Sequence, residues 1–487
     1  MDGSGAPARR ADLLTIGDRI AELGIIDKAP EGCVRYDVTG LIVAPGFIDS
    51  HSHDDAILLE PTGSLAKLSQ GVTSVVVGNC GIGLPPWTPS TRNTRPPPPL
   101  NLLGNADRYV FPTYASYFAA LRNAAARPKT EGSPRSLTRG CVAHALVLAG
   151  HSTLRAARVA DLRGPATPEE LRSMLRDLEE GLDQGLTGLS AGLAYPAAIG
   201  APASEIVALA RAAFRRGRVF SLHIRNEYEG MWTALDEAFA IAREALGDSP
   251  PYGARLILSH QKCAGPSNRG RAEKLLTRIE VASREIPLAF DAYPYDAGST
   301  LLEAESVRAS RRVLVTWSDP HPELAGLDLL EAAERLGKSP EEAIGELSPA
   351  GAAYFHMDEA DMEAILSHPL CMVGSDGLPN DASPHPRLYG AFPRYLARFV
   401  RESRRLSLEE AVRKITALPA SVYGIRDRGL LVRGAIADIT VFRPETVDSL
   451  SNWAHPREIA AGIALVFREG LRAYGAPIPE NQGAGGR

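Results

Sequence analysis

Residues 47–55 read FIDSHSHDD, and this stretch decides how the rest of the chain is interpreted. An apolar run ends here in two histidines, His51 and His53, with one residue between them. Residues two apart in a strand point to the same side, so both imidazoles can face one point beyond the end of the strand. Converging imidazoles are typical ligands of a divalent transition metal. We therefore expect a strand that ends at a metal site.

Seven further apolar runs have the length and composition of buried strands, and stretches of helical period such as 167–185 and 204–217 lie between them. This alternation predicts a parallel sheet with crossover helices. Eight such units favour an α/β fold of the TIM-type (β/α)8 barrel class, with a doubly wound sheet as the alternative. The eight strand candidates are residues 41–53, 74–80, 141–151, 186–195, 219–224, 255–260, 287–295 and 371–377.

The two ends of the chain have a different character from the middle. Short Val- and Ile-containing runs broken by glycine occupy 12–24, 33–40, 429–447 and 462–474. We expect them to pair into a small β-sandwich, formed by residues 1–43 and 426–475 around a barrel of residues 44–425, with 476–487 as a flexible tail. The long, mostly helical segment 297–355 interrupts the barrel pattern, and a loop of that length in a barrel is typical of a lid.

The composition restricts the class of partner. The formal charge is -5 over 487 residues and no long basic run occurs, so neither nucleic acid nor anionic lipid is expected as a partner. No run of about 18 apolar residues is present, which argues against a membrane span and favours a cytoplasmic protein. The five cysteines form no CxxC pair, so a disulfide scaffold is not expected. Small-molecule chemistry is the remaining class.

Potential metal ligands stand at the ends of five strand candidates. A thiolate near imidazoles is a strong zinc ligand, and barrel enzymes keep their reactive groups at this end of the strands. We assign the other cysteines and the remaining histidines, such as His151 and His356, to structure or surface. They have no other potential metal ligand at a useful spacing in the sequence. The candidate ligands are His51, His53, Cys80, His223, His260 and Asp376.

Longer motifs are much more specific than the paired histidines. HIRNE at 223–227, YPYDAGST at 293–300 and HPRLYGAFPR at 385–394 resemble the amidohydrolase superfamily, and within it the N-acyl-D-amino-acid deacylases, or D-aminoacylases. The resemblance extends over nearly the whole chain. It implies a barrel flanked by a β-sandwich and one firmly held zinc ion, bound by Cys80, His223 and His260. It also implies a second, weaker site formed by His51, His53 and Asp376, with Cys80 shared.

The resemblance further implies the residues that would hold the substrate. A free α-carboxylate suits a guanidinium fork, an ammonium group and hydroxyl donors. We expect Tyr195 to lie near the scissile carbonyl as a hydrogen-bond donor. The expected carboxylate anchors are Lys262, Tyr293, Ser299 and Arg387.

The reaction implied is hydrolysis of an N-acyl-D-amino acid to a carboxylate and a free D-amino acid. A zinc ion lowers the pKa of bound water towards roughly 7, and Asp376 would act first as general base and then as general acid. We expect a monomer or a small homo-oligomer that takes a small-molecule substrate. One alternative is removal of an L-aminoacyl or peptidyl group from a specialised metabolite. The other is a cyclic-amide hydrolase of the hydantoinase or dihydroorotase type, which the lack of a lysine in 186–195 disfavours.

Overall fold

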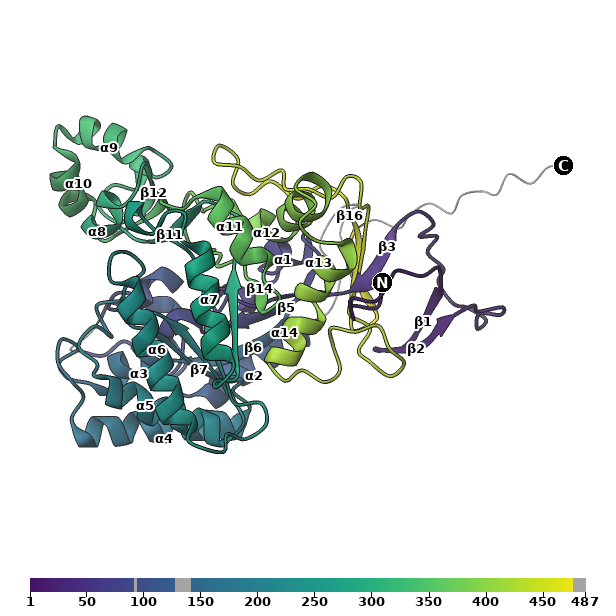
Figure 1. The fold of residues 1–487 in the computed structure, drawn as a ribbon, viewed down its shortest axis with the longest axis horizontal. Helices are drawn as coiled ribbons and strands as arrows, with labels where there is room; N and C mark the ends of the chain where they lie inside the picture. The colour runs from purple at the N-terminus through teal and green to yellow at the C-terminus, as the bar shows by residue number, and fades with distance from the viewer. Residues whose placement is uncertain (92–93, 128–141, 476–487) are drawn as a thin grey trace.

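An eight-stranded parallel sheet forms the centre of the molecule (Figure 1). The computed structural model describes residues 1–91, 94–127 and 142–475, so the predicted tail 476–487 and Cys141 lie outside the described residues. All eight predicted strands are present in this sheet, with neighbours in chain order. They are β4 (Phe47–Asp49), β5 (Val72–Val77), β6 (His144–Gly150), β7 (Gly188–Gly192), β8 (Val219–His223), β9 (Arg255–Leu258), β10 (Leu288–Ala292) and β14 (Cys371–Val373).

The sheet closes on itself between its first and last strands. Ser50 N donates to the carbonyl of Val373 at 3.3 Å, and Asp376 N donates to the carbonyl of His51 at 2.7 Å. These bonds join the end of β4 to the end of β14, so the sheet is a barrel rather than an open, doubly wound sheet. The predicted fold class is confirmed.

Helices on the outside of the barrel cover its strands, as the positions of α4, α5, α6 and α7 in Figure 1 show. α4 begins where the sequence predicts, because Thr167 and Glu170 form a capping box and Pro168 occupies the first turn. It ends at Gly185, which takes the left-handed conformation. The helices of the barrel are α1 (Leu65–Leu68), α2 (Tyr114–Ala125), α3 (His151–Arg158), α4 (Pro168–Gln184), α5 (Ala203–Arg215), α6 (Met231–Leu246), α7 (Ala272–Ser283), α11 (Glu359–Ser367), α12 (Arg387–Leu396), α13 (Leu408–Lys414) and α14 (Ala417–Val422).

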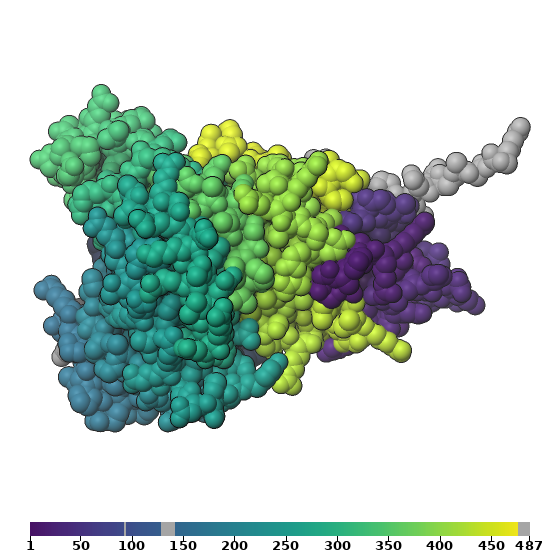
Figure 2. Space-filling model, viewed as in Figure 1, coloured from purple at the N-terminus to yellow at the C-terminus, as the bar shows by residue number. Residues whose placement is uncertain are grey.

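Both ends of the chain contribute to two small antiparallel sheets, as expected. β3 pairs with β15, so residues near the two termini lie side by side, as the purple and yellow segments of Figure 2 show. One expectation is wrong: residues 33–40 form no strand. The pairing strand is β3, which the sequence had placed at the start of the first barrel strand. The sheets contain β1 (Asp12–Ile16) with β2 (Arg19–Gly24), and β3 (Ile42–Pro45) with β15 (Ile439–Phe442), β16 (Ile463–Arg468) and β17 (Leu471–Tyr474).

The two small sheets pack against each other through apolar side chains. Ile20 of β2 belongs to one buried cluster with Ile439 and Leu465 of the other sheet. A hollow of about 1460 Å³ lies beside this cluster and is lined by residues of both sheets and of the N-terminal segment, but by none of the predicted site residues. We propose residues 1–43 and 426–475 as the two parts of one small domain, although β3 crosses the boundary at residue 43.

The insertion at 297–355 forms a lobe far from the small sheets (Figure 1). The helices α8, α9 and α10 were expected, but the insertion is not mostly helical, because a three-stranded antiparallel sheet in the order β11-β13-β12 accompanies them. Within the described residues, no helix is both long and apolar enough to cross a membrane. The elements of the lobe are β11 (Ala297–Leu301), α8 (Ala304–Arg308), β12 (Val313–Ser318), α9 (Leu329–Leu336), α10 (Pro340–Leu347) and β13 (Ala350–Phe355).

Candidate metal centre and active site

The predicted ligands meet at one end of the barrel because parallel strands have their carboxyl ends at the same edge. His223 is the last residue of β8, and His260 follows β9 by two residues. Cys80 lies in a short 3-10 turn, Asn79–Gly81, directly beyond β5. Asp376 follows β14 by three residues, and His51 follows β4 by two. The structure therefore brings the six candidate ligands together from five strands.

Three of them form a first cluster. Cys80 Sγ lies 3.3 Å from His260 Nε2, and His260 Nε2 lies 3.2 Å from His223 Nδ1. The candidate ligand atoms of all three residues lie within 4.8 Å of one another, and all three residues are buried. One thiolate and two imidazoles are a donor set that zinc prefers, and three protein ligands leave a coordination position for water or substrate. The residues of this cluster therefore fit a catalytic zinc ion.

A second cluster shares the cysteine. Cys80 Sγ lies 3.2 Å from His51 Nε2, while Asp376 Oδ1 lies 3.2 Å from His53 Nε2 and 3.5 Å from His51 Nε2. The ligand atoms of these four residues also lie within 4.8 Å of one another. The two clusters therefore adjoin at one sulfur atom, as the family resemblance implies.

The backbone is strained at three of the candidate ligands. Cys80, His260 and Asp376 have φ values of 54°, 34° and 49°, a region that residues with a side chain rarely adopt. Backbone strain of this kind costs on the order of 1–3 kcal/mol per residue and persists where the surrounding structure enforces it. All three residues lie just beyond the carboxyl ends of barrel strands, and Cys80 shares a candidate ligand cluster with each of the other two.

Electrostatic interactions favour the ionised forms of the thiol and the carboxyl group. Burial opposes ionisation of Cys80, but the positive charges of His51 and His260 hold the pKa of its thiol well below the usual value. Burial likewise opposes ionisation of Asp376, and the Arg387 guanidinium beside it holds the pKa of that carboxyl well below its usual range. Both groups are therefore anionic at neutral pH and can bind a cation.

Two acidic residues that the sequence analysis missed orient the imidazoles. Asp291 Oδ1 lies 3.2 Å from His51 Nδ1 and accepts a hydrogen bond from His260 N at 2.8 Å. Glu227 Oε1 lies 3.1 Å from His260 Nδ1. A carboxylate on the far nitrogen fixes the orientation of a ligating imidazole and increases its basicity. Asp291 carries a readable signal, since it is an acidic residue inside the apolar run of β10.

The predicted substrate residues lie around the same end of the barrel. Arg387 Nη1 lies 2.9 Å from Asp376 Oδ2, and its guanidinium carbon is 4.5 Å from the centre of the Tyr293 ring. Arg387 Nη2 also donates to the carbonyl of Ser299 at 3.2 Å. The Ser299 hydroxyl has no hydrogen-bond partner among the described residues. Arg387, Tyr293 and Ser299 are thus one connected group beside Asp376.

Lys262 and Tyr195 lie next to the residues of the first cluster. Lys262 Nζ lies 2.8 Å from His260 Nδ1 and donates to Glu227. The Tyr195 ring centre is 5.1 Å from that of His223, and its hydroxyl is 3.0 Å from Thr300 Oγ1 in the insertion. Each predicted substrate residue is therefore within reach of the clusters, although Lys262 is already paired with a carboxylate.

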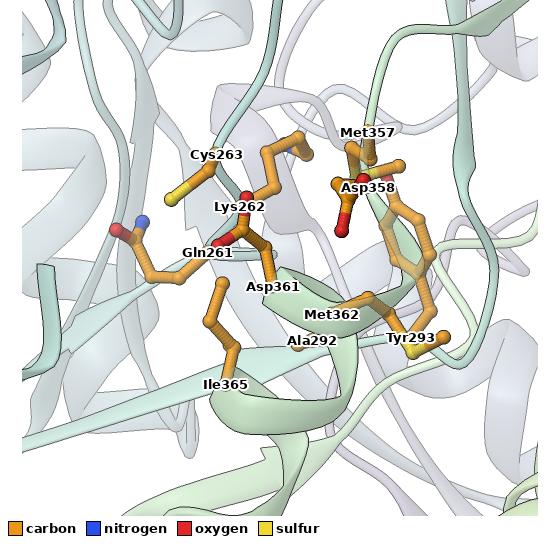
Figure 3. A pocket seen from close by; sticks show the side chains of 10 residues that line it. All are labelled: Gln261, Lys262, Cys263, Ala292, Tyr293, Met357, Asp358, Asp361, Met362 and Ile365. Carbon is orange, nitrogen blue, oxygen red and sulfur yellow. The ribbon is translucent and has the colours of Figure 1, made fainter. Parts of the chain in front are cut away.

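A small cavity lies beside two of these residues. Figure 3 shows that Lys262 and Tyr293 line it together with Cys263 and Met357. Its volume is about 10 Å³, which is room for one water molecule and not for an amino-acid derivative. This cavity is therefore not a candidate for the substrate site, which leaves the region around the candidate metal ligands.

This chain is similar to known proteins over almost its full length. The profile of the amidohydrolase family matches residues 36–452. A D-aminoacylase from Alcaligenes xylosoxydans xylosoxydans is 44% identical over 483 residues, covering 99% of this chain and 93% of the relative. A solved D-aminoacylase structure, described with a binuclear metal centre, superposes with a TM-score of 0.88 at 41% identity, covering 99% of this chain and 96% of the other.

A second solved structure carries ligands. It is the N-acyl-D-glutamate deacylase from Bordetella bronchiseptica, in complex with zinc and a phosphonate inhibitor that mimics the tetrahedral intermediate of its reaction. The TM-score is 0.88 and the identity 42%, over 98% of this chain and 96% of that chain.

Proposed function

The chain belongs to the amidohydrolase family, and from this premise we propose that it hydrolyses the amide bond of N-acyl-D-amino acids to a carboxylate and a free D-amino acid. The observation that carries the proposal is the convergence of Cys80, His223 and His260 within 4.8 Å of one another, next to the carboxylate of Asp376. Cyclic-amide hydrolases of this superfamily commonly bridge two metals through a carboxylated lysine. The fourth barrel strand, β7, has the sequence GLSAG and offers no lysine for that role.

We assign the metal ligands as follows. Cys80, His223 and His260 would hold one firmly bound zinc ion, and His51, His53 and Asp376, sharing Cys80, would form a weaker second site. When bound, zinc supplies Lewis acidity, which activates water and polarises the scissile carbonyl. The carboxylates of Asp291 and Glu227 keep the ring nitrogens of His51 and His260 turned towards the metal side.

Asp376 is the proposed proton carrier. Its Oδ1 faces the imidazoles, whereas its Oδ2 is held by Arg387, so one oxygen is fixed and the other is available at the reacting centre. It would take a proton from the attacking water and then deliver that proton to the nitrogen of the leaving amine. Without this delivery the leaving group would be an amide anion, which is too basic to depart.

The amino-acid carboxylate would bind between Arg387, Lys262, Tyr293 and Ser299. The half-buried hydroxyl of Ser299 supports this assignment, because it has no partner in the described part of the chain and can donate to a ligand. Tyr195 beside His223 would donate to the scissile carbonyl. Fixing the carboxylate at one end places the amide at the metal and supplies orientation.

Access to the centre requires movement. His51 is 0% exposed and His223, the most exposed of the first cluster, is 7% exposed. We propose that the insertion 297–355 is a lid that opens, since Thr300 at its start contacts Tyr195 over the clusters. We further propose a cytoplasmic protein, monomeric or a small homo-oligomer. The cysteines of the described residues are free, which suits a reducing compartment.

Hydrolysis of paired enantiomers tests the proposal. Zinc-reconstituted protein is incubated with the N-acetyl derivatives of D- and L-methionine, leucine, phenylalanine and glutamate, and the released amine is quantified. Turnover of D substrates alone supports the proposal. Turnover of L substrates alone would favour the L-aminoacyl alternative, and turnover of a hydantoin or dihydroorotate in their place would favour the cyclic-amide alternative.

A further inference from the structure

One histidine outside both clusters has an unused polar atom directed at the substrate residues. His356 follows β13, directly after the insertion 297–355, and is 9% exposed. Its Nε2 has no hydrogen-bond partner among the described residues. An unpartnered buried donor or acceptor is costly, with a penalty that a ligand can remove. The sequence analysis had assigned His356 to structure or surface, because no metal-like partner is near it in the chain.

Tyrosines hold the ring of His356 in place. The Tyr228 hydroxyl lies 3.2 Å from His356 Nδ1, and the ring of Tyr354 stacks on the imidazole with centres 6.2 Å apart and planes 13° apart. We assign the proton of the neutral ring to Nε2, because a phenol hydroxyl is a good donor and Nδ1 then accepts from Tyr228. The free atom is then an N–H donor with a fixed direction.

That donor points into the space between the proposed carboxylate anchors. A Cβ built on Gly298 would lie 3.1 Å from His356 Nε2 and 3.3 Å from the Tyr293 hydroxyl, so both polar atoms converge over this glycine. Ser299, whose hydroxyl is also without a partner among the described residues, is the next residue. Burial and the nearby cations Lys262 and Arg387 lower the pKa of His356, so the ring is neutral in a region of positive potential. An anionic group completes such a site.

We propose that His356 is a further substrate-binding residue, whose Nε2–H donates a hydrogen bond to the α-carboxylate of the N-acyl amino acid, and that Tyr228 is its positioning residue. The inference rests on the proposed function and deepens it. With His356, the subsite holds three neutral donors, Tyr293, Ser299 and His356, in addition to the two cations. Ser299 at the start of the insertion and His356 directly after its end then both bind the substrate.

The test compares H356F, which removes the donor, with H356Q, whose side-chain amide can place an N–H near the position of Nε2. N-acetyl-D-methionine is the substrate and free D-methionine the competitive inhibitor, both with zinc-loaded full-length protein. We expect H356F to raise KM and the inhibition constant about tenfold or more, with kcat within about threefold and zinc content unchanged. H356Q should recover most of the loss, and Y228F should show a smaller rise in KM.

H144F is the matched control, because His144 lies at the opposite end of the barrel, at the start of β6. It makes the same chemical change and should leave KM unchanged. An unchanged KM in H356F, a loss confined to kcat, or an H356Q variant as impaired as H356F would overturn the inference. Wild-type protein that hydrolyses no N-acyl-D-amino acid would overturn the proposed function as well, and that failure is visible without any variant.

Discussion

Arg387 Nη1 lies 2.9 Å from Asp376 Oδ2, so the proposed carboxylate anchor is ion-paired with the proposed proton carrier. A single guanidinium therefore faces the substrate carboxylate and also orients the residue that handles the proton. Lysine keeps the charge but loses the planar fork that can serve both contacts. We predict that R387K raises KM and lowers kcat, with kcat/KM falling by more than about tenfold.

Steady-state kinetics with N-acetyl-D-methionine check this prediction for Arg387. R394K is the matched control, since Arg394 lies on the same helix and donates to the carbonyl of Pro294. If the KM and kcat of R387K matched those of R394K, the Arg387–Asp376 pair would not be needed for substrate binding or catalysis.

Cys80 belongs to both candidate metal sites. C80S replaces a thiolate by a neutral hydroxyl, which is a poor zinc ligand. Loss of a residue that only hydrogen-bonds to a metal ligand typically lowers metal affinity 10- to 100-fold. Loss of the ligand itself should cost more, so we predict that C80S lowers zinc affinity more than about 100-fold. Metal analysis after dialysis measures the effect. C263S is the control, since Cys263 is buried but belongs to neither cluster, and equal zinc retention by the two variants would contradict the assignment.

Lys67 joins the first and last strands of the barrel from beneath the metal site. Its Nζ lies 2.8 Å from Asp49 Oδ2, 3.1 Å from Asp54 Oδ2 and 2.7 Å from Ser375 Oγ, and the lysine is fully buried. K67M would leave buried carboxylates without a counter-charge. We therefore predict a loss of about 3–5 kcal/mol in the free energy of unfolding.

Urea unfolding of zinc-loaded protein measures the loss in K67M. The control is K338M, whose lysine is exposed and 3.8 Å from Glu346, and which we expect to change stability by less than about 1 kcal/mol. A K67M variant as stable as K338M would mean that the buried carboxylates are protonated or solvated.

His356 also predicts a pH dependence of stability. Burial and the charges of Lys262, Arg311 and Arg387, opposed by that of Glu227, lower the pKa of His356 to about 3. The folded pKa lies below the unfolded value of about 6.5, so the unfolded chain takes up a proton first and stability falls as the pH drops below 6.5. At pH 5 this loss is about 2 kcal/mol.

The variant H356Q has no such proton to take up, so it should lose about 2 kcal/mol less than wild type between pH 7 and pH 5. Urea unfolding at the two pH values gives the comparison. Other titrating groups contribute equally to both proteins and cancel in the difference. An equal loss in both proteins would mean that the His356 imidazole titrates in the folded state as it does in the unfolded chain.

The barrel could be predicted from the sequence because each strand is a short apolar run with a polar residue at its carboxyl end. The prediction of one continuous first strand was wrong. Residues 42–45 and 47–49 look like one strand in the sequence, but they belong to different sheets on either side of Gly46. The sheet in the insertion was missed because β11 and β13 are rich in alanine and glycine, which have weak strand preference.

The convergence of the candidate ligands was predictable for the same reason, whereas that of the residues around them was not. Cys80, His223 and Asp376 each end a recognisable strand, so their convergence follows from the fold. Glu227 and Lys67 reach the centre from a loop and from a short helix, and their burial depends on ion pairs between distant segments. No local pattern encodes such pairs. The role proposed for His356 was not predicted, because it depends on an Nε2 atom that has no hydrogen-bond partner among the described residues. Only the three-dimensional structure shows this.

Titration of zinc into metal-free protein, with hydrolysis of N-acetyl-D-methionine as the readout, tests the central claim most directly. The thiolate–imidazole centre predicts no turnover without metal, and a rise to a plateau at about one equivalent of zinc that C80S does not show. Full turnover by the metal-free protein, or an identical titration curve for C80S, would contradict it.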